Sequence, residues 1–191
     1  RVARWRAASD AAVPVRITAG FWTSRHLARH LPPQHGSLWI PAFVPSNATL
    51  DLARRAADIG IRNTPPDHSW LARRKLRHIT YAVYGRSPDL AGFVTLPATA
   101  DLPRSQRWLH ETHGDAIRAT AADTRLCLDL ALSGHGRIVM PCFAGEAEPG
   151  LVCLSDPIPD LTHDEWLVSH HEARQDPPIR AALDAITRAL G

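Results

Sequence analysis

The chain contains eleven histidines, so metal binding is the first chemistry to consider. His26 and His30 lie four residues apart and could share a helix face, but no carboxylate or third ligand accompanies them in the sequence. The segment HETH at 110–113 is one residue short of the HExxH pattern that places two imidazoles on one helix face for zinc. His170 and His171 would point to opposite sides of a strand. We therefore expect exposed histidines on helix faces and no metal site.

Nucleophilic chemistry has one candidate, Cys142, which follows a strand-like run and Pro141. A catalytic thiol needs a base within hydrogen-bond reach, and the sequence marks no histidine partner for this one. The chain also lacks a GxSxG elbow, a P-loop and a GxGxxG segment. The three cysteines are widely spaced in apolar runs, which favours reduced, packed thiols. The residues predict neither an enzyme nor a cofactor.

Composition and charge are those of an ordinary globular protein. The 191 residues are 45% hydrophobic and 21% charged, which is enough to bury a core in one domain or in two small lobes. No apolar stretch approaches the roughly 18 residues of a membrane span, and the first residues show no secretion signal, so we expect a cytoplasmic location. The net charge is +3, and the basic cluster at 73–77 lacks interleaved aromatics. We expect that cluster to be a solvated stretch before a strand, without nucleic-acid binding by this chain.

The first part of the chain alternates between strand and helix patterns. Val15, Ile17 and Ala19 alternate as in a strand, and a turn at 20–24 leads into a helix that Pro32 stops. The pattern continues with a strand at 38–44, a short helix at 50–57 and a buried strand at 58–62. This repeated order predicts an α/β fold with a parallel sheet.

The second part repeats the pattern after a change of character. A long strand-like run at 76–84 is followed by a loop-rich stretch at 86–106, where a second lobe begins. A helix that starts near 120–123 and ends at Gly134 leads into a strand at 137–140, and further strands are expected at 151–154 and 165–170. The last helix is the clearest, with Asp176 as a possible cap, Pro177 at its first position and an apolar stripe of Ile179, Leu183, Ile186 and Leu190.

The turns from strand to helix are the places that suit ligand capture. A helix that begins after a parallel strand directs its free backbone N–H groups and the positive end of its dipole beyond the strand ends, where anionic or polar molecules bind. Thr23, Ser24 and Asp123 lie at such turns, either as helix caps alone or as caps that also face a ligand. Trp22 could stack on a ligand or cover the core.

The order of the segments resembles the effector-binding domain of LysR-type transcriptional regulators. The resemblance spans about 15–190 and is carried by VRITAGFWTSRHLARHLP, LDLARRAADIGIRN, LRHITYAVYGRSP, LDLALSGHGRIVMP, EPGLVCL and the final EWLVSHHEARQDPPIRAALDAITRAL. It implies two Rossmann-like lobes of the type 2 periplasmic-binding-protein kind, joined by two crossing strands. It also implies a connector at 1–14, a first lobe formed by 15–80 with 169–191, and a second lobe at 81–168.

The same resemblance implies a small anionic or aromatic effector in the cleft between the lobes, and a winged helix-turn-helix upstream that this chain does not contain. It further implies a homodimer or homotetramer that contacts DNA only through that upstream domain. The ligand-binding residues implied are Trp22, Thr23, Ser24, Arg62, Asn63, Tyr84, Asp123, Thr124, Cys142 and Phe143. The bulky Phe21 and Trp22 depart from the small or hydroxyl residues frequent at the family's first turn. The alternatives are a transporter's solute-binding protein, which needs an export signal or lipid anchor, and an enzyme on the same bilobal fold.

Overall fold

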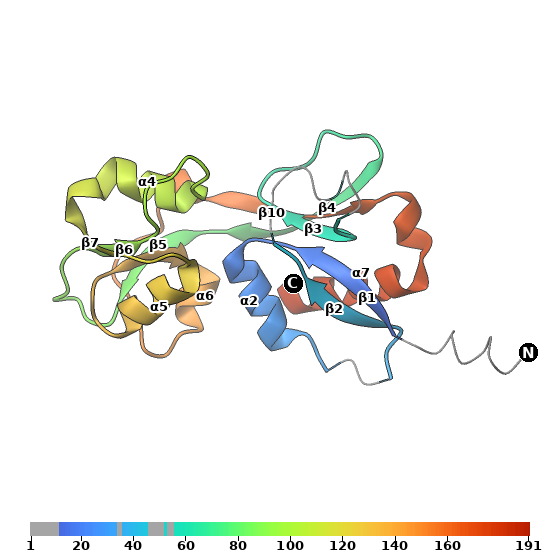
Figure 1. The fold of residues 1–191 in the computed structure, drawn as a ribbon, viewed down its shortest axis with the longest axis horizontal. Helices are drawn as coiled ribbons and strands as arrows, with labels where there is room; N and C mark the ends of the chain where they lie inside the picture. The colour runs from blue at the N-terminus through green and yellow to red at the C-terminus, as the bar shows by residue number, and fades with distance from the viewer. Residues whose placement is uncertain (1–11, 34–35, 46–51, 53–55) are drawn as a thin grey trace, which may run out of the picture. The chain divides into compact units, whose positions relative to one another are not determined.

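The computed structural model describes residues 12–33, 36–45, 52 and 56–191 (Figure 1). The chain divides into two compact units, one formed by 1–77 with 164–191 and the other by 78–163. The division falls within the strand β4 (Leu71–Ile79) and within the strand β10 (His163–His170), so both strands continue from one unit into the other. The connector expected at 1–14 and the helix expected at 50–57 lie largely outside the described residues.

A five-stranded sheet with the order β2-β1-β3-β10-β4 forms the first unit. The strand β1 (Val13–Thr18) pairs in parallel with β2 (Trp39–Phe43) and with β3 (Ile59–Arg62), whereas β10 pairs antiparallel with β3. The parallel arrangement predicted from the strand–helix order is therefore confirmed. Because parallel strands end at the same edge of a sheet, the segments that follow β1 and β3 lie together at one edge.

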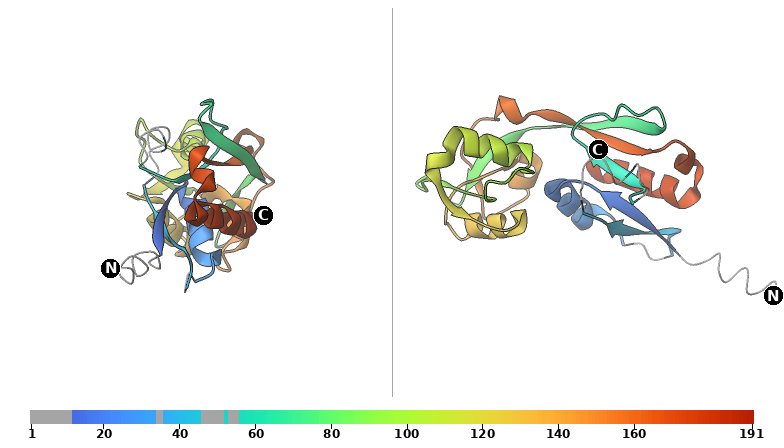
Figure 2. Two further views of the ribbon diagram at one scale, coloured as in Figure 1. Left: turned by 90° about the vertical axis from the view of Figure 1, so that its right-hand side faces the viewer. Right: turned by 45° about the horizontal axis from the view of Figure 1, so that its top comes forward.

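Two helices of the first unit, α2 (Phe21–His30) and α7 (Pro177–Leu190), share one hydrophobic core with the sheet (Figure 2). Their apolar stripes meet alternate residues of β1, because helical spacing and strand alternation each place side chains on one face. The core comprises Val15, Ile17, Ala19, Leu27, Trp39, Ile59, Ile61, Leu167, Ile179, Ala182, Ala185, Ile186 and Leu190. His26 adds a polar link, because its Nε2 lies 3.0 Å from the Ala189 carbonyl oxygen of α7.

The second unit contains two small sheets, β8-β5-β9 and β6-β7. An isolated parallel bridge between Phe93 and Arg137 joins them, because the N–H of Val94 donates to the Arg137 carbonyl at 2.8 Å. The elements of this unit are β5 (Tyr81–Gly85), β6 (Phe93–Thr95), α4 (Arg104–His113), η1 (Gly114–Ala116), β7 (Ile117–Thr120), α5 (Thr124–Leu132), β8 (Ile138–Pro141), α6 (Cys142–Glu146), β9 (Val152–Cys153) and η2 (Pro159–Leu161). Phe93, Leu109, Val139, Ile158 and Leu161 form one of its cores.

Several expected elements differ from the structure. The run at 76–84 is two strands, β4 and β5, separated at Thr80, and the stretch 86–106 holds β6 and the start of α4. The basic cluster at 73–77 lies inside β4, not before a strand. The side chain of Asp176 makes no capping hydrogen bond at α7, although Pro177 begins that helix. Between β10 and α7 the chain forms a short helix, η3 (Glu172–Gln175).

Candidate functional site

The first turn of α2 lies at the edge of the sheet where β1 and β3 end. Thr18 of β1 and Gly60 of β3 are register partners, so Gly20 and Arg62 follow at the same edge. The first helical hydrogen bond of α2 joins the N–H of Ser24 to the Gly20 carbonyl at 2.9 Å. The three N–H groups of residues 21–23 precede that bond, and Gly20 has no side chain with which to cap them. This helix start can therefore donate hydrogen bonds to the oxygens of a bound anion.

A buried charged network supports this turn. Glu165 is 4% exposed, and its carboxylate accepts hydrogen bonds from the Thr23 hydroxyl and, at 2.8 Å, from Nε of Arg77. Arg77 also donates to the Thr23 hydroxyl at 3.5 Å. Burying a carboxylate costs free energy unless the group is paired and hydrogen-bonded. The ion pair with Arg77 and the hydrogen bond from Thr23 offset this cost for Glu165. The network links β4, β10 and α2, and so fixes the position of the helix start.

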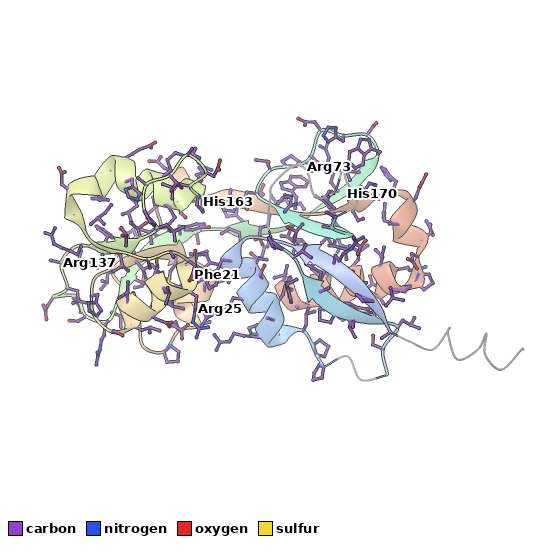
Figure 3. All side chains as sticks on the ribbon, viewed as in Figure 1. Phe21, Arg25, Arg73, Arg137, His163 and His170 are labelled. Carbon is purple, nitrogen blue, oxygen red and sulfur yellow. The ribbon has the colours of Figure 1, made fainter. Side chains whose placement is uncertain are left out.

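The five residues predicted for the first unit have different surroundings at this edge. Trp22 and Thr23 are buried, and Trp22 meets the ring of Phe21 edge to face at a centroid distance of 4.9 Å. Ser24 is partly exposed and donates from its hydroxyl to the Ala19 carbonyl at 3.2 Å. Arg62 is partly exposed at the end of β3, and Asn63 is exposed directly after it. Phe21, labelled in Figure 3, is therefore the more exposed ring of the turn.

Three parallel strands of the second unit, β7, β6 and β8, also end at one edge. The helix α5 follows β7 there, and α6 follows β8, so Thr124 and Cys142 begin helices at that edge. The start of α5 is capped, because the carboxylate of Asp123 accepts the Leu126 N–H at 2.9 Å. An acidic cap already occupies the position that a ligand anion would take at α5.

The turn from β8 to α6 is held from beneath by Tyr84. This side chain is 2% exposed, and its hydroxyl donates to the Cys142 carbonyl at 3.4 Å. Burial, followed by the neighbouring Cys142 and Cys153, raises the pKa of Tyr84 well above its ordinary value. Cys142 and Phe143 are partly exposed on the turn itself. Tyr84 thus supports the turn, while Cys142 and Phe143 are accessible on it.

Sequence reasoning missed two groups of polar residues at these edges. The first is Glu165 with Arg77, for which the signal was a charged residue inside the apolar run EWLV. The second is a buried pair in the second unit, where the Thr95 hydroxyl donates to the Gln106 side-chain oxygen, which also accepts the Leu96 N–H at 3.3 Å. No local pattern marks that pair. Within the described residues, no three His, Cys, Asp or Glu side chains gather as metal ligands, and no helix is long and apolar enough to cross a membrane.

Comparison with known proteins gives a consistent family. A family model described as the LysR substrate binding domain matches residues 43–191. No curated protein matches significantly. Among solved structures, the regulatory domain of CrgA, a LysR-type transcriptional regulator from Neisseria meningitidis, is similar with a TM-score of 0.72 and 19% identity, covering 95% of this chain and all of that one.

Two further structures share the fold. Full-length OxyR C199D from Pseudomonas aeruginosa has a TM-score of 0.66 and 15% identity, with 100% of this chain and 74% of that chain covered. DarR from Vibrio fischeri in complex with DNA has a TM-score of 0.65 and 13% identity, with 98% and 72% covered. The matches favour a regulator over a transporter's solute-binding protein and confirm the two-lobe, periplasmic-binding-protein-like α/β fold. The chain belongs to the LysR substrate-binding domain family, the regulatory domain of LysR-type transcriptional regulators.

Proposed function

We propose that this domain senses a small-molecule effector whose acidic group binds at the first turn of α2. The observation that carries the proposal is the uncapped helix start, whose N–H groups at 21–23 precede the first helical hydrogen bond. Backbone N–H groups and the helix dipole together favour an anion at such a place. Ser24 adds an accessible hydroxyl and Phe21 an accessible ring beside it. Trp22 and Thr23 act here by shaping the turn, and Arg62 and Asn63 by flanking it.

We further propose that Thr124, Cys142 and Phe143 of the second unit contact the uncharged part of the effector. The acidic cap Asp123 already accepts the helix N–H at α5, so this helix start favours hydroxyl or apolar groups over a carboxylate. Tyr84 contributes by holding the backbone of Cys142.

The experiment is a thermal-shift and calorimetric screen of carboxylate metabolites against matched variants at Gly20. A Cβ at Gly20 would meet no atom within 4 Å, so substitution there is tolerated. Gly20→Asp places a carboxylate where the effector's anion would bind, and Gly20→Asn places a neutral side chain of the same shape. We expect both to stabilise α2 by only about a few tenths of a kcal/mol, while only Gly20→Asp weakens binding of the acidic hit, by at least about tenfold. Equal affinity of Gly20→Asp and Gly20→Asn would overturn the proposal.

We also propose that the whole protein acts on DNA through a separate domain and assembles as a homodimer. Similar regulators have been solved in complex with DNA, including DarR. For the assembly, β2 is an edge strand of the sheet, and large apolar side chains are exposed along it and beside it: Val13, Leu38, Ile40 and Phe43. A strand edge with exposed apolar side chains is a natural surface for pairing with a second copy. Light scattering after size exclusion tests this, because Ile40→Glu should give a monomer and the exposed Leu126→Glu should not.

A further inference from the structure

The first unit contains a cavity that lies away from the start of α2. It has a volume of about 370 Å³, which is within the range of small-ligand sites. Its lining comes from β4, β10, η3 and α7, all of them parts of the first unit (Figure 2, right, where β4 is green and β10 orange). The residues that line it are Ala72, Arg73, Arg74, Leu167, Ser169, Arg174, Gln175, Arg180, Leu183 and Asp184.

The rim of this cavity is strongly basic. Four arginines, Arg73, Arg74, Arg174 and Arg180, and one acidic residue, Asp184, are among the residues that line it. In the part of the chain that the structure describes, none of the four lies within 4.0 Å of a carboxylate oxygen. Four positive charges around one recess repel one another, and an anion between them would relieve that repulsion.

Two other cations of β4 are paired with carboxylates, unlike Arg73 and Arg74. Lys75 pairs with Asp164 at 2.8 Å, and Arg77 pairs with Glu165 at 2.8 Å. Arg73 donates instead to the neutral Pro66 carbonyl at 2.8 Å, and Arg74 to the Thr187 hydroxyl. These neutral partners orient the two guanidinium groups without cancelling their charge. The strand therefore carries two neutralised cations and two cations that border the cavity (Arg73 is labelled in Figure 3).

The floor of the cavity includes a serine hydroxyl. Ser169 of β10 is 3% exposed, and among the described residues its side chain has no hydrogen-bond partner. Leu167 is buried beside it, and Leu183 is partly buried. The Ser169 oxygen is not among the fully buried unpaired polar atoms of the described residues, so it is open to the cavity and can take a ligand group as its hydrogen-bond partner.

From the rim and the floor together we infer that this cavity binds a small polyanion that carries two or more carboxylate or phosphate groups. Arginine matches both groups through paired N–H donors. The four arginines come from three elements, β4, η3 and α7, so one oxyanion cannot satisfy them all and a ligand with several is favoured. The hydroxyl at the floor selects a molecule that enters the recess, whereas a nucleic-acid duplex would contact only the rim.

The site is separate from the proposed effector site and would act on different parts of the unit. A polyanion in the cavity contacts the two strands that continue into the second unit, and ties them to α7. It would stabilise the folded first unit by mass action, because the unfolded chain lacks the cavity. Binding of a second metabolite could thus be measured independently of any effector at α2.

The test uses citrate and pyrophosphate as separate probes in calorimetry and thermal unfolding of the whole chain. Arg74→Gln with Arg180→Gln removes two rim charges, and Ser169→Ala removes the floor hydroxyl at unchanged charge. Arg118→Gln with Arg125→Gln is the control, because it removes two exposed arginine charges from the second unit.

We expect at least one probe to bind the wild type and the control equally, with affinity reduced more than tenfold in the Arg74/Arg180 variant and several-fold in Ser169→Ala. The ratio of citrate to pyrophosphate affinity identifies the favoured oxyanion class. Absence of binding by both probes, or equal losses in the control, would overturn the inference. Binding of a short DNA duplex that depends on Arg74 and Arg180 but not on Ser169 would also overturn it, because the rim would then be a nucleic-acid surface.

Discussion

Replacing Glu165 by glutamine tests the network beneath the α2 start. The side-chain exposures of Arg77 and Glu165 are 16% and 6%, so their ion pair is largely withdrawn from water. Glutamine keeps the size and can still accept the Thr23 hydroxyl, but it removes the negative charge that faces the guanidinium. The substitution therefore isolates the electrostatic part of the network from its packing.

The expected loss follows from the burial. Breaking a buried ion pair costs about 3–5 kcal/mol, because one charge remains in a medium of low polarity. Arg77 retains some access to water, so we expect the lower end, about 3 kcal/mol. For a protein of 150–250 residues each kcal/mol lowers Tm by roughly 2–4 °C, which gives a fall of roughly 6–12 °C.

The assay is urea and thermal unfolding followed by circular dichroism, with Lys75→Gln as the matched control. Lys75 pairs with Asp164 at the same distance of 2.8 Å and joins the same two strands, but the side chains are 53% and 32% exposed. We expect the control to lose less than about 1 kcal/mol. The double variant Arg77→Met with Glu165→Leu should regain much of the stability lost in Glu165→Gln. A loss in Glu165→Gln no larger than in the control would refute this reasoning.

Three further predictions concern other supports of the fold. Asp123→Ala removes the cap of α5 and should cost about 1 kcal/mol in urea unfolding, with Asp123→Asn nearly neutral. Gly145→Ala should cost about 1–3 kcal/mol, since its Cβ would overlap the buried ring of Tyr84 and displace α6; unchanged Tm would contradict this. Burial alone would raise the pKa of Asp58, but hydrogen bonds and charge from Arg16 hold it below 3.8. Asp58→Asn should therefore cost about 1–2 kcal/mol at neutral pH, and its difference from wild type should shrink as pH falls below 3.8.

The elements that sequence reasoning located are those with long, regular apolar spacing. The last helix shows it most plainly, because Ile179, Ile186 and Leu190 recur at helical spacing and are all buried against the sheet. The strands β1 and β3 were found because short apolar runs are bounded by turn residues, and the parallel pairing of β1 with β2 follows from the helix α2 between them. Local pattern and tertiary packing agree at these places.

The strand β6 and the helix α4 of the second unit were not predicted, because much of what holds them in place is hydrogen bonding between polar side chains and backbone. The helix α4 has the polar sequence RSQRWLHETH, and two of its three buried residues, Ser105 and Gln106, are polar. The side-chain oxygen of Gln106 accepts hydrogen bonds from the Thr95 hydroxyl and the Leu96 N–H, which allows Gln106 to be buried. No periodicity in the sequence reveals these hydrogen bonds. The strand β6 has only three residues, all of them buried, and so shows no alternation. Hydrogen bonds here act beside the hydrophobic contacts of Phe93 and Leu109, and sequence patterns record only the hydrophobic contacts.

Sequence reasoning likewise located some residues of the candidate site and missed others. Turn positions such as Ser24 and Thr124 follow from the local order of strand and helix. The pairing of Arg77 with Glu165 spans 88 residues and depends on the register of β4 beside β10, which no local pattern contains. A charged residue inside a buried strand signals that a partner exists, but only the sheet identifies it.

The two helix starts differ in the charge already present at them, and under the proposed function this difference bears on which effector binds. At α5 the carboxylate of Asp123 already accepts a helix N–H, so an acidic ligand group placed there would meet a like charge. At α2, Gly20 leaves the corresponding N–H groups without a capping side chain. A single acidic group is therefore favoured at α2, and we expect charge substitutions at Gly20 to alter effector affinity far more than neutral substitutions at Thr124. If the effector proves to have no acidic group, the absence of a capping side chain at α2 has no explanation in ligand binding.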